Sequence, residues 1–364
     1  PAPVVRAPGR PVPGHYIIVL QPGANPRAVA AIAGASPTFV YDAALNGFAA
    51  TLNDPQLNGL RRHPSVAYIE EDQEVGNVTT QTGATWGLDR IDQRNRPVNG
   101  TFVYTRTGAG VTAYIIDTGI RASHQDFGGR APATRGYDAI DGTLPADDCN
   151  GHGSHVAGTV GGATYGVAKG VTLVAVRVLN CDGSGTTAGV IAGVNWVTAD
   201  HAGTAPAVAN MSLGGGASSS LDTAVRNSIA DGVSYAVAAG NGNVVGIAAD
   251  ACRYSPARVA EAMTIGASDS SDRKASFSNY GKCVDWFAPG VAITSAWSAS
   301  DTATNTISGT SMATPHTAGV AALYLEDDTA ASTSTVRTAL FDLTTKSIVT
   351  SARTTNNHLL FTDY

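Results

Sequence analysis

Ser308-Gly309-Thr310-Ser311-Met312-Ala313-Thr314-Pro315-His316 is a turn of small residues that runs directly into the apolar stretch 317–325. Pro315 is tolerated only near the start of a helix, so the sequence predicts a helix that begins at about Ser311. The first main-chain N–H groups and the dipole of such a helix would face any group that Ser311 attacks. A serine at this position is more often a simple helix cap, so a catalytic role depends on partners elsewhere in the chain.

The composition is that of a soluble globular protein. The 364 residues, of which 43% are hydrophobic, suffice for one large domain and a small one. A net charge of -6 provides no basic surface for nucleic acid, so that class of partner is excluded. Uncharged stretches such as 183–199 are rich in Gly, Thr and Asn, and lack the roughly 20 consecutive apolar residues that a membrane span needs. The chain opens Pro1-Ala2-Pro3-Val4 without Met or an apolar signal core, so we expect that any secretory signal has been removed or lies outside this sequence.

Four cysteines lie far apart, at positions Cys149, Cys181, Cys252 and Cys283. They contain no Cys-x-x-Cys pair, which disfavours a zinc ribbon or a thioredoxin-like redox site. The even count indicates two disulfides, for which the sequence alone allows three pairings. Four buried free thiols are the alternative. Disulfides would indicate an oxidising, extracellular compartment.

Residues 14–75 have the pattern of a small separate domain. Strands are predicted at 16–20, 38–41, 47–52 and 66–71, and helices at 25–33 and 54–62, in the order βαββαβ. This order fits a ferredoxin-like α+β domain, with Asp54 capping the second helix and Pro55 as its first residue. The polar, glycine-flanked stretch 76–83 follows. We interpret it as a linker to a second domain, in which packing restarts at Trp86.

From Trp86 onward, apolar strands alternate with helices. Buried strands are predicted at 111–116, 173–178, 207–212, 233–239 and 262–266, and helices at 152–160, 188–199, 221–230 and 311–325. This alternation predicts an α/β fold, a doubly wound and mostly parallel sheet with helices on both faces. In that architecture, functional residues gather at the carboxyl ends of the strands.

One candidate residue stands at the end of a predicted strand and another at the start of a predicted helix. Asp117 directly follows the apolar strand 111–116, where its alternative role is to cap the Thr118-Gly119 turn. His152 lies between glycines at the start of a helix of small residues, so little hinders its approach to a partner. His155 shares a helix face with His152, which suggests a metal pair as a rival, but no further His or Cys follows at zinc spacing. We interpret His155 as a structural histidine.

The apolar run 233–239 ends in Gly240, Asn241 and Gly242. By itself, Asn241-Gly242 indicates a hairpin turn. Next to a nucleophile, the side-chain N–H of Asn241 and the main-chain N–H of Ser311 would together bind a developing oxyanion. Four separate positions therefore fit one constellation for acyl transfer.

The chain order Asp117, His152, Ser311 and the motifs around these residues resemble the subtilisin-like serine proteases. The resemblance rests on Asp117-Thr118-Gly119, on the stretch His152-Gly153-Ser154-His155-Val156-Ala157-Gly158, and on Gly309 to His316, and it extends over 86–361. Residues 86–93 and both cysteine neighbourhoods are similar to the proteinase K branch, and most of all to its aqualysin-like members. The stretch Gly309 to Ala313 does not match the Gly-x-Ser-x-Gly elbow of lipases, because Ala313 replaces the last glycine.

The resemblance implies a role for each of these residues. Ser311 becomes the nucleophile, His152 the general base and then acid, Asp117 the group that orients the imidazole, and Asn241 the oxyanion donor. It also implies the sequential disulfides, Cys149 with Cys181 and Cys252 with Cys283. No organic cofactor is implied, and we expect a monomer.

The resemblance further implies a peptide-binding cleft. Gly183-Ser184-Gly185 and Ser212-Leu213-Gly214 match segments that pair with an extended substrate on both sides, although their glycines could be turn residues. Ala238-Ala239-Gly240 would line the first specificity pocket. Because no charge is visible there, we expect a preference for apolar or aromatic side chains over Lys or Arg.

A structural calcium ion is implied by the same branch. Asp285 and the carbonyls of Ala260 and Ala262 match positions that hold one ion through oxygen ligands, although Asp285 could be a surface carboxylate. Three residues depart from the family pattern: Ser154 stands where Thr is usual, Thr317 where Val is usual, and Gly242 where a bulkier residue is common. None of the three departures removes a reacting atom.

The small N-terminal unit resembles the inhibitory propeptide of these proteases, which aids folding and is cleaved off by the enzyme itself. An unrelated accessory domain is the alternative. We therefore expect a propeptide domain at 1–79, a peptidase domain at 80–364 and self-cleavage within Val75 to Gly83. The competing functional hypothesis is a catalytically silent binding scaffold.

Overall fold

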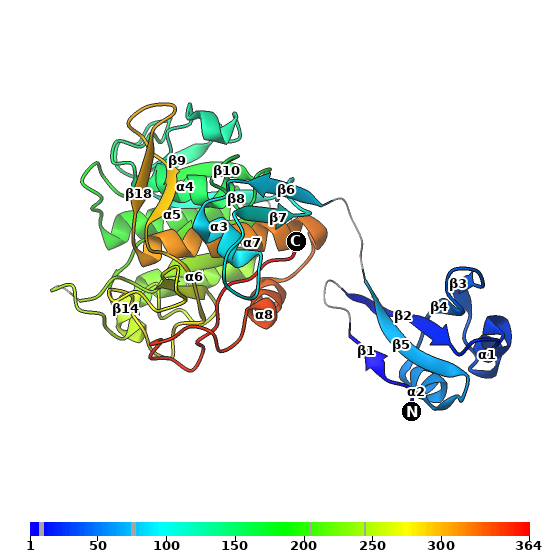
Figure 1. Ribbon diagram of the computed structural model, residues 1–364. Coiled ribbons are helices and arrows are strands. Elements are labelled where there is room, and N and C mark those ends of the chain that lie inside the picture. Colours follow the sequence, from blue (N-terminus) through cyan, green and yellow to red (C-terminus); the bar gives the residue numbers. More distant parts are fainter. Residues whose placement is uncertain (7–10, 74–77, 202, 204, 244) are drawn as a thin grey trace. The chain divides into compact units, whose positions relative to one another are not determined.

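The apolar strands of the C-terminal part form a seven-stranded sheet in which every neighbouring pair is parallel (Figure 1). The sheet order is β16-β15-β13-β11-β8-β10-β9. The strands are β8 Thr112–Asp117, β9 Gly136–Asp138, β10 Thr172–Arg177, β11 Ala207–Met211, β13 Val233–Ala238, β15 Met263–Ser268 and β16 Trp286–Pro289. The predicted α/β class with a mostly parallel sheet is confirmed, and the five predicted strands are all present. Strands β9 and β16 were not predicted.

The computed structural model describes residues 1–6, 11–73, 78–201, 203, 205–243 and 245–364. It falls into two compact units, residues 1–77 and 78–362. The helices of the larger unit are α3 Trp86–Ile91, α4 His152–Gly161, α5 Thr187–Asp200, α6 Ser219–Asp231, α7 Thr310–Asp327 and α8 Thr333–Leu343. Short 3₁₀ turns are η1 Gln125–Phe127 and η2 Ala251–Arg253.

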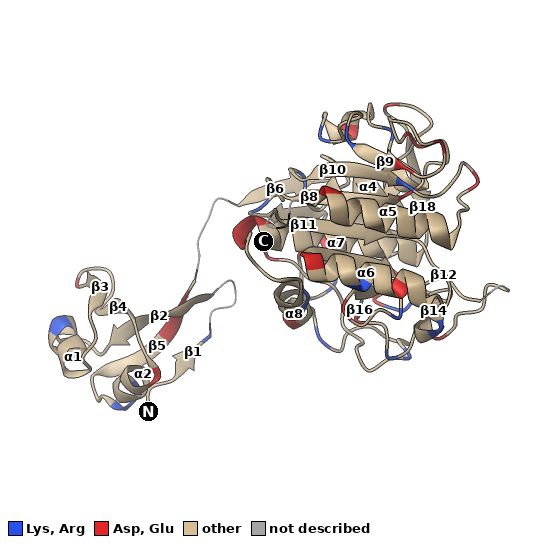
Figure 2. Cartoon of the chain, turned by 180° about the vertical axis from the view of Figure 1, so that it is seen from behind, with Lys and Arg blue, Asp and Glu red and all other residues tan. Residues whose placement is uncertain are grey.

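Helices cover both faces of this sheet, because the side chains of each strand alternate between two cores. In β8, Ala113 and Ile115 pack with α3, α4, α7 and α8, whereas Tyr114 and Ile116 pack with α5 and α6. Lys, Arg, Asp and Glu are sparse along α4, α5 and α7 (Figure 2). Helices α4 and α7 are largely buried, whereas α5 buries one face, so the low charge content of the sequence reflects α4 and α7 most directly.

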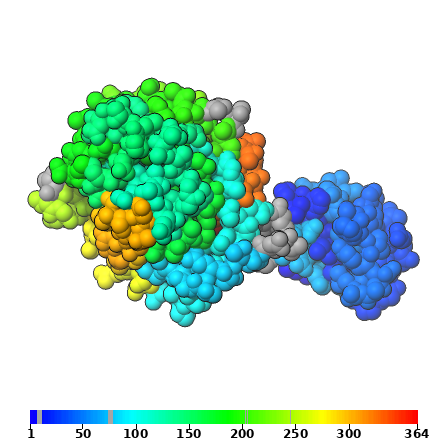
Figure 3. Space-filling model, turned by 90° about the horizontal axis from the view of Figure 1, so that it is seen from above, coloured from blue at the N-terminus to red at the C-terminus, as the bar shows by residue number. Residues whose placement is uncertain are grey.

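Three two-stranded ladders complete the larger unit. They pair β6 Thr79–Thr82 with β7 Thr101–Tyr104, β12 Gly215–Gly216 with β14 Tyr254–Ser255, and β17 Ile293–Ala296 with β18 Thr304–Ile307. The turn that joins β17 to β18 is fixed by an ion pair in which Arg121 Nε donates to Asp301 at 2.7 Å. Figure 3 shows the orange surface of this hairpin beside the green surface of the segments around α4.

The N-terminal unit has the predicted βαββαβ order with one additional strand. Its elements are β1 Val4–Val5, β2 Pro11–Leu20, α1 Pro26–Ile32, β3 Pro37–Tyr41, β4 Gly47–Thr51, α2 Asp54–Arg62 and β5 Val66–Gln73. They form a sheet of order β1-β5-β2-β4-β3, and the apolar side chains Ile18, Phe48, Leu60 and Ile69 are its buried centre. The short β1 was not predicted.

Two details of this region differ from the sequence-based predictions. Helix α2 is capped by Asn53 and not by Asp54, because Asn53 Oδ1 accepts from Gln56 N while the Gln56 side chain accepts from Asn53 N. The predicted linker 76–83 is not wholly a linker, since Thr79–Thr82 pairs with β7. Residues 74–77, which include the start of that linker and the end of the predicted 14–75 domain, lie outside the described part of the chain.

Candidate active site

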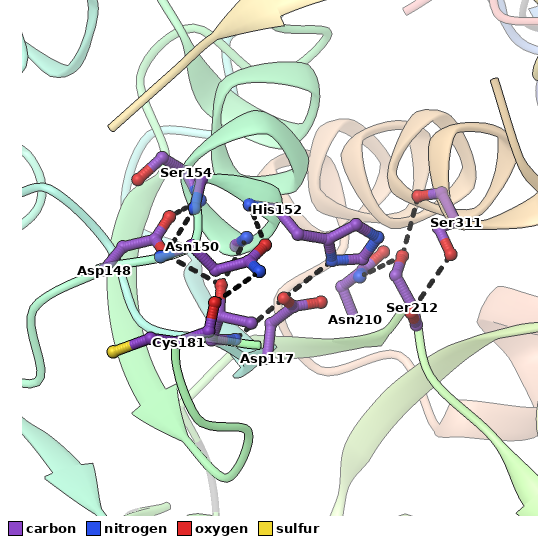
Figure 4. Close-up of polar contacts among 12 residues, drawn as sticks. Asp117, Asp148, Asn150, His152, Ser154, Cys181, Asn210, Ser212 and Ser311 are labelled. Carbon is purple, nitrogen blue, oxygen red and sulfur yellow. Dashed lines mark hydrogen bonds and ion pairs between the residues drawn. The ribbon is translucent and has the colours of Figure 1, made fainter. Parts of the chain in front are cut away.

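Each of the four candidate catalytic residues lies at the carboxyl end of the sheet or at a helix start. Figure 4 shows three of them, Asp117, His152 and Ser311. Asp117 is the last residue of β8, and His152 is the first residue of α4. Asn241 follows β13, and Ser311 is the second residue of α7. Residues more than 190 positions apart in sequence thus meet in one site, since the parallel strands all end at the same edge.

The Asp117 carboxylate holds the imidazole of His152. Nδ1 of His152 donates to Oδ1 of Asp117 at 2.7 Å, and the N–H of Thr118 donates to the same oxygen at 2.7 Å. Asp117 is fully buried. Burial of His152 acts to lower its pKa, but the charge and hydrogen bond of Asp117 and the charge of Asp148 outweigh it, so the pKa of His152 is raised above its ordinary value.

The approach of His152 depends on a glycine. Gly151 has φ 111°, in the left-handed region, and a Cβ on it would lie 2.4 Å from the indole of Trp297. Only glycine therefore fits at this residue. It turns the chain so that α4 begins with His152 facing Asp117.

The Ser311 hydroxyl donates to the main-chain carbonyl of Ser212 at 3.1 Å. In Figure 4 the imidazole of His152 lies between Asp117 and this serine pair. Completion of the triad therefore requires rotation of the Ser311 hydroxyl from this carbonyl toward His152.

The carbonyl of Ser311 has an unusual partner. Pro315 is the sixth residue of α7, further inside the helix than the sequence predicted, and it has no N–H to donate to the carbonyl of Ser311 four residues before it. The hydroxyl of Ser212 donates to that carbonyl instead, at 2.8 Å. Nδ2 of the buried Asn210 in turn donates to the Ser212 hydroxyl at 2.9 Å.

Asn241 is oriented by Thr310. Oδ1 of Asn241 accepts from both the N–H and the hydroxyl of Thr310, each at 2.8 Å. Because the oxygen is bound in this way, Nδ2 is the side-chain group left to donate to an oxyanion. Thr310 and Asn210 are positioning groups that the sequence reasoning missed, because only the folded chain shows what their side chains contact.

All nine candidate substrate-binding residues line two cavities, which have in common Leu213, Gly214, Gly215, Gly216 and Ser255. One, of about 550 Å³, is lined by His152 together with Gly183, Ser184, Gly185, Ser212, Leu213 and Gly214. The other, of about 440 Å³, is lined by Asn241 and Ser311 together with Leu213, Gly214, Ala238, Ala239 and Gly240. None of the described residues around the second cavity is charged.

His155 is a buried structural histidine. Its Nε2 contacts the carbonyls of Ile293 and Asn305 at 3.0 and 3.2 Å. Burial lowers the pKa of His155 to about 4. Along the described chain, no group of three His, Cys, Asp or Glu side chains is arranged to hold a metal ion.

Both sequential disulfides are present, Cys149–Cys181 and Cys252–Cys283. The structure also accounts for two departures from the family pattern. The hydroxyl of Thr317 accepts from the buried indole N–H of Trp286 at 3.1 Å. Gly242 has φ 100°, and a Cβ on it would lie 2.8 Å from the main chain of Gly246, so glycine is needed where this loop folds back.

The predicted calcium ligands face a cationic side chain. Arg337 donates to Oδ1 of Asp285 at 2.5 Å and to the carbonyl of Ala262 at 3.3 Å. Burial raises the pKa of Asp285, against the lowering effect of the Arg337 charge. The carboxylate and the carbonyl both bind this guanidinium, so a calcium ion, which takes oxygen ligands of these kinds, would have to replace Arg337 there. Ala260 lies in the turn just before Ala262.

Comparison with known proteins gives matches to two families. Residues 108–360 match the subtilase family, and residues 15–76 match the peptidase inhibitor I9 family. The chain is 55% identical to the extracellular serine proteinase of Thermus sp. (strain Rt41A), over 97% of this chain and 90% of that protein. It is 53% identical to alkaline serine exoprotease A of Vibrio alginolyticus, over 88% of this chain and 59% of that protein.

A solved structure is similar as well. The crystal structure of a cold adapted subtilisin-like serine proteinase matches with a TM-score of 0.73 and 54% identity, over 77% of this chain and 98% of that chain. The fold, the site and these matches define a serine endopeptidase. The chain belongs to the subtilase family, and its N-terminal unit is an inhibitor I9 propeptide domain. No described helix is long and apolar enough to cross a membrane.

Proposed function

We propose that this endopeptidase is secreted and cleaves peptide bonds through an acyl-enzyme formed on Ser311. The 2.7 Å hydrogen bond between His152 and Asp117, with the imidazole turned toward Ser311, is the observation that carries the proposal (Figure 4). In the first step, Oγ of Ser311 attacks the carbonyl carbon and its proton passes to Nε2 of His152. Asp117 keeps the imidazole in the required tautomer and stabilises the imidazolium.

In the second part of the reaction, His152 returns the proton that it accepted from Ser311. The main-chain N–H of Ser311 and Nδ2 of Asn241 bind the oxyanion of the tetrahedral intermediate. When the intermediate collapses, the C–N bond breaks and His152 gives its proton to the leaving amine. Water then attacks the ester with His152 as base, which releases the new carboxyl end and restores the Ser311 hydroxyl.

An extended substrate pairs with Gly183 to Gly185 on one side and with Ser212 to Gly214 on the other. The side chain before the cleaved bond enters the uncharged cavity beside Ala238, Ala239 and Gly240. Peptides that differ only in that residue test the preference. Phe or Leu should give a higher kcat/KM than Lys or Arg, and a preference for a cation would contradict it.

Labelling with a fluorophosphonate tests the nucleophile. The processed protein should take up one label, and the Ser311→Ala variant none. Persistent refusal of the label by the unsubstituted protein would favour the silent scaffold over the enzyme.

The I9 domain is the intramolecular inhibitor of this precursor, and the enzyme removes it by cutting within Val75 to Gly83. The polar stretch after a separate compact unit supports this assignment. On incubation, the mass should fall to that of a chain starting within 76–84, whereas the Ser311→Ala chain should stay intact. Processing of that variant without added protease would refute self-cleavage.

A calcium ion stabilises the peptidase unit through Asp285 and the carbonyls of Ala260 and Ala262. The convergence of two of these oxygens on the Arg337 guanidinium supports the site. Chelation should lower the Tm, and calcium should restore it. The Asp285→Asn variant should lose most of this response, and an unchanged calcium response in that variant would place the ion elsewhere.

A further inference from the structure

A second buried carboxylate lies next to the triad. Asp148 is only 5% exposed and belongs to the loop that leads into α4. Its Oδ1 accepts from the N–H groups of Asn150 and Gly151, at 3.0 and 2.8 Å. Its Oδ2 accepts from the N–H of Ser154 at 2.8 Å (Figure 4). Three main-chain donors around the first turn of the His152 helix thus point at one side chain.

The fourth contact of Asp148 reaches the strand that carries Asp117. Thr118 directly follows Asp117, and its hydroxyl donates to Oδ1 of Asp148 at 2.8 Å. The same hydroxyl accepts from the N–H of Gly153, next to His152, at 2.9 Å. A Cβ on Gly153 would lie 2.1 Å from the carbonyl of Gly119, so the start of α4 and the end of β8 are in close main-chain contact.

A purely stabilising role does not account for the burial of the Asp148 carboxylate. Among the described ion pairs, none includes Asp148, although a buried carboxylate without a cationic partner is costly. Its compensation comes from donors that surround His152 and from the positive end of α4. The hydrogen bonds that compensate the buried charge of Asp148 therefore lie where the start of α4 meets the end of β8. They set the position of His152 relative to Asp117.

We propose that Asp148 is a positioning residue for peptide hydrolysis. It holds the start of α4 against the end of β8 and so fixes the contact between His152 and Asp117. The proposal rests on the role of His152 as general base. Neither the family matches nor the triad motif assigns a role to Asp148.

The charge of Asp148 has a second effect, on the titration of His152. The charged or titratable groups that act on the imidazole are Asp117 from β8, Asp148 from the preceding loop and His155 from the same helix. Asp148 contributes to the raised pKa of His152, after the larger contributions of burial and Asp117. Removal of this charge should lower the pKa of His152.

The Asp148→Asn variant of the full chain, allowed to process, tests both effects. We expect kcat to fall about 10- to 100-fold, since small displacements of catalytic groups have effects of this size, with little change in KM. The acid limb of the kcat/KM profile should also move to lower pH. Wild-type kcat together with an unmoved acid limb would overturn the proposal.

Asp126→Asn is the matched control. Asp126 is also buried and accepts from a main-chain N–H, that of Thr164 at 2.7 Å, but it lies beyond the opposite end of α4. Loss of its charge should cost stability without changing kcat or the acid limb. A fall in kcat equal to that of Asp148→Asn would show a merely structural effect and overturn the proposal.

If the Asp148→Asn variant does not fold, variants of Thr118 test the positioning role of Asp148. Thr118→Val removes the bridging hydroxyl but leaves the Asp148 charge, so kcat should fall while the acid limb stays in place. Thr118→Ser should restore kcat, and wild-type kcat in Thr118→Val would overturn the positioning role. Failure of the underlying mechanism is distinguishable, because it would appear as full activity of His152→Ala.

Discussion

The two disulfides offer a matched test of what holds the active site together. Cys149 and Cys181 are 32 residues apart, and Cys252 and Cys283 are 31 apart. With loops of nearly equal length, loss of either bridge should destabilise the fold by about 3.7 kcal/mol through the entropy of the unfolded chain. For a unit that spans 78–362, with an unfolding entropy of about 0.6 kcal/mol per degree, this corresponds to a Tm lower by about 6 °C.

Activity should separate the two variants. Cys149 lies between Asp148 and Asn150, Nδ2 of Asn150 donates to the carbonyl of Cys181 at 2.8 Å, and Oδ1 of Asn150 accepts from the N–H of His152 at 3.1 Å. The Cys149→Ser/Cys181→Ser variant should therefore lose kcat as well as stability. The Cys252→Ser/Cys283→Ser variant should lose stability, with any kinetic change confined to KM, because Tyr254 and Ser255 line the uncharged cavity beside Ala238, Ala239 and Gly240.

The assay needs two measurements on processed enzyme. Tm is read after inhibition with a serine-directed phosphonate, which prevents autolysis, and at two scan rates, because unfolding of proteases is often irreversible. The kcat is read below the lower Tm and normalised to titrated active sites. An equal loss of kcat in both variants, or a Tm change in only one of them, would refute the reasoning.

Three further predictions concern single side chains. Asn241→Ala should lower kcat with little change in KM; in subtilisin, loss of the matching donor costs about 100- to 1000-fold, a magnitude transferred from that relative, and an unchanged kcat would remove Asn241 from the oxyanion site. His155 and His316 are buried with pKa values lowered to about 4, so the unfolded chain binds their protons first as the pH falls. Stability should decline from about pH 6.5 to pH 4, by about 3 kcal/mol for each histidine, and denaturant titrations of His155→Gln should show a shallower decline. Thr317→Val should leave the Trp286 indole N–H without its acceptor and cost about 1–3 kcal/mol; a more stable variant in urea unfolding would contradict this.

Local patterns in the sequence predicted most of the fold, because hydrophobic period and helix signals are short-range. Helix α4 was predicted at 152–160 and is His152–Gly161, and α5 was predicted at 188–199 and is Thr187–Asp200. The missed elements depend on distant partners. Strand β6, Thr79–Thr82, is polar and forms only against β7, and β1 has two residues that pair with β5.

In the candidate site, too, features set by local sequence could be predicted and those set by distant partners could not. Asp117, His152, Asn241 and Ser311 each follow a recognisable strand or start a helix, so their common location could be predicted. The contacts of Asp148 with Thr118 and of Asn210 with Ser212 could not, because they join side chains whose neighbours are set by tertiary packing. Arg337, 52 positions from Asp285, was missed at the predicted calcium ligands for the same reason.

Pro315 affects Ser311 because proline has no main-chain N–H. Any other residue at 315 would present an N–H to the carbonyl of Ser311, and that carbonyl would then have a partner in its own helix as well as in Ser212. With proline, the hydroxyl of Ser212, a residue of the predicted substrate-binding segment, is the partner that the structure gives this carbonyl. Because this hydrogen bond joins the segment to the first turn of α7, a displacement of Ser212 would act on the main chain of Ser311 directly.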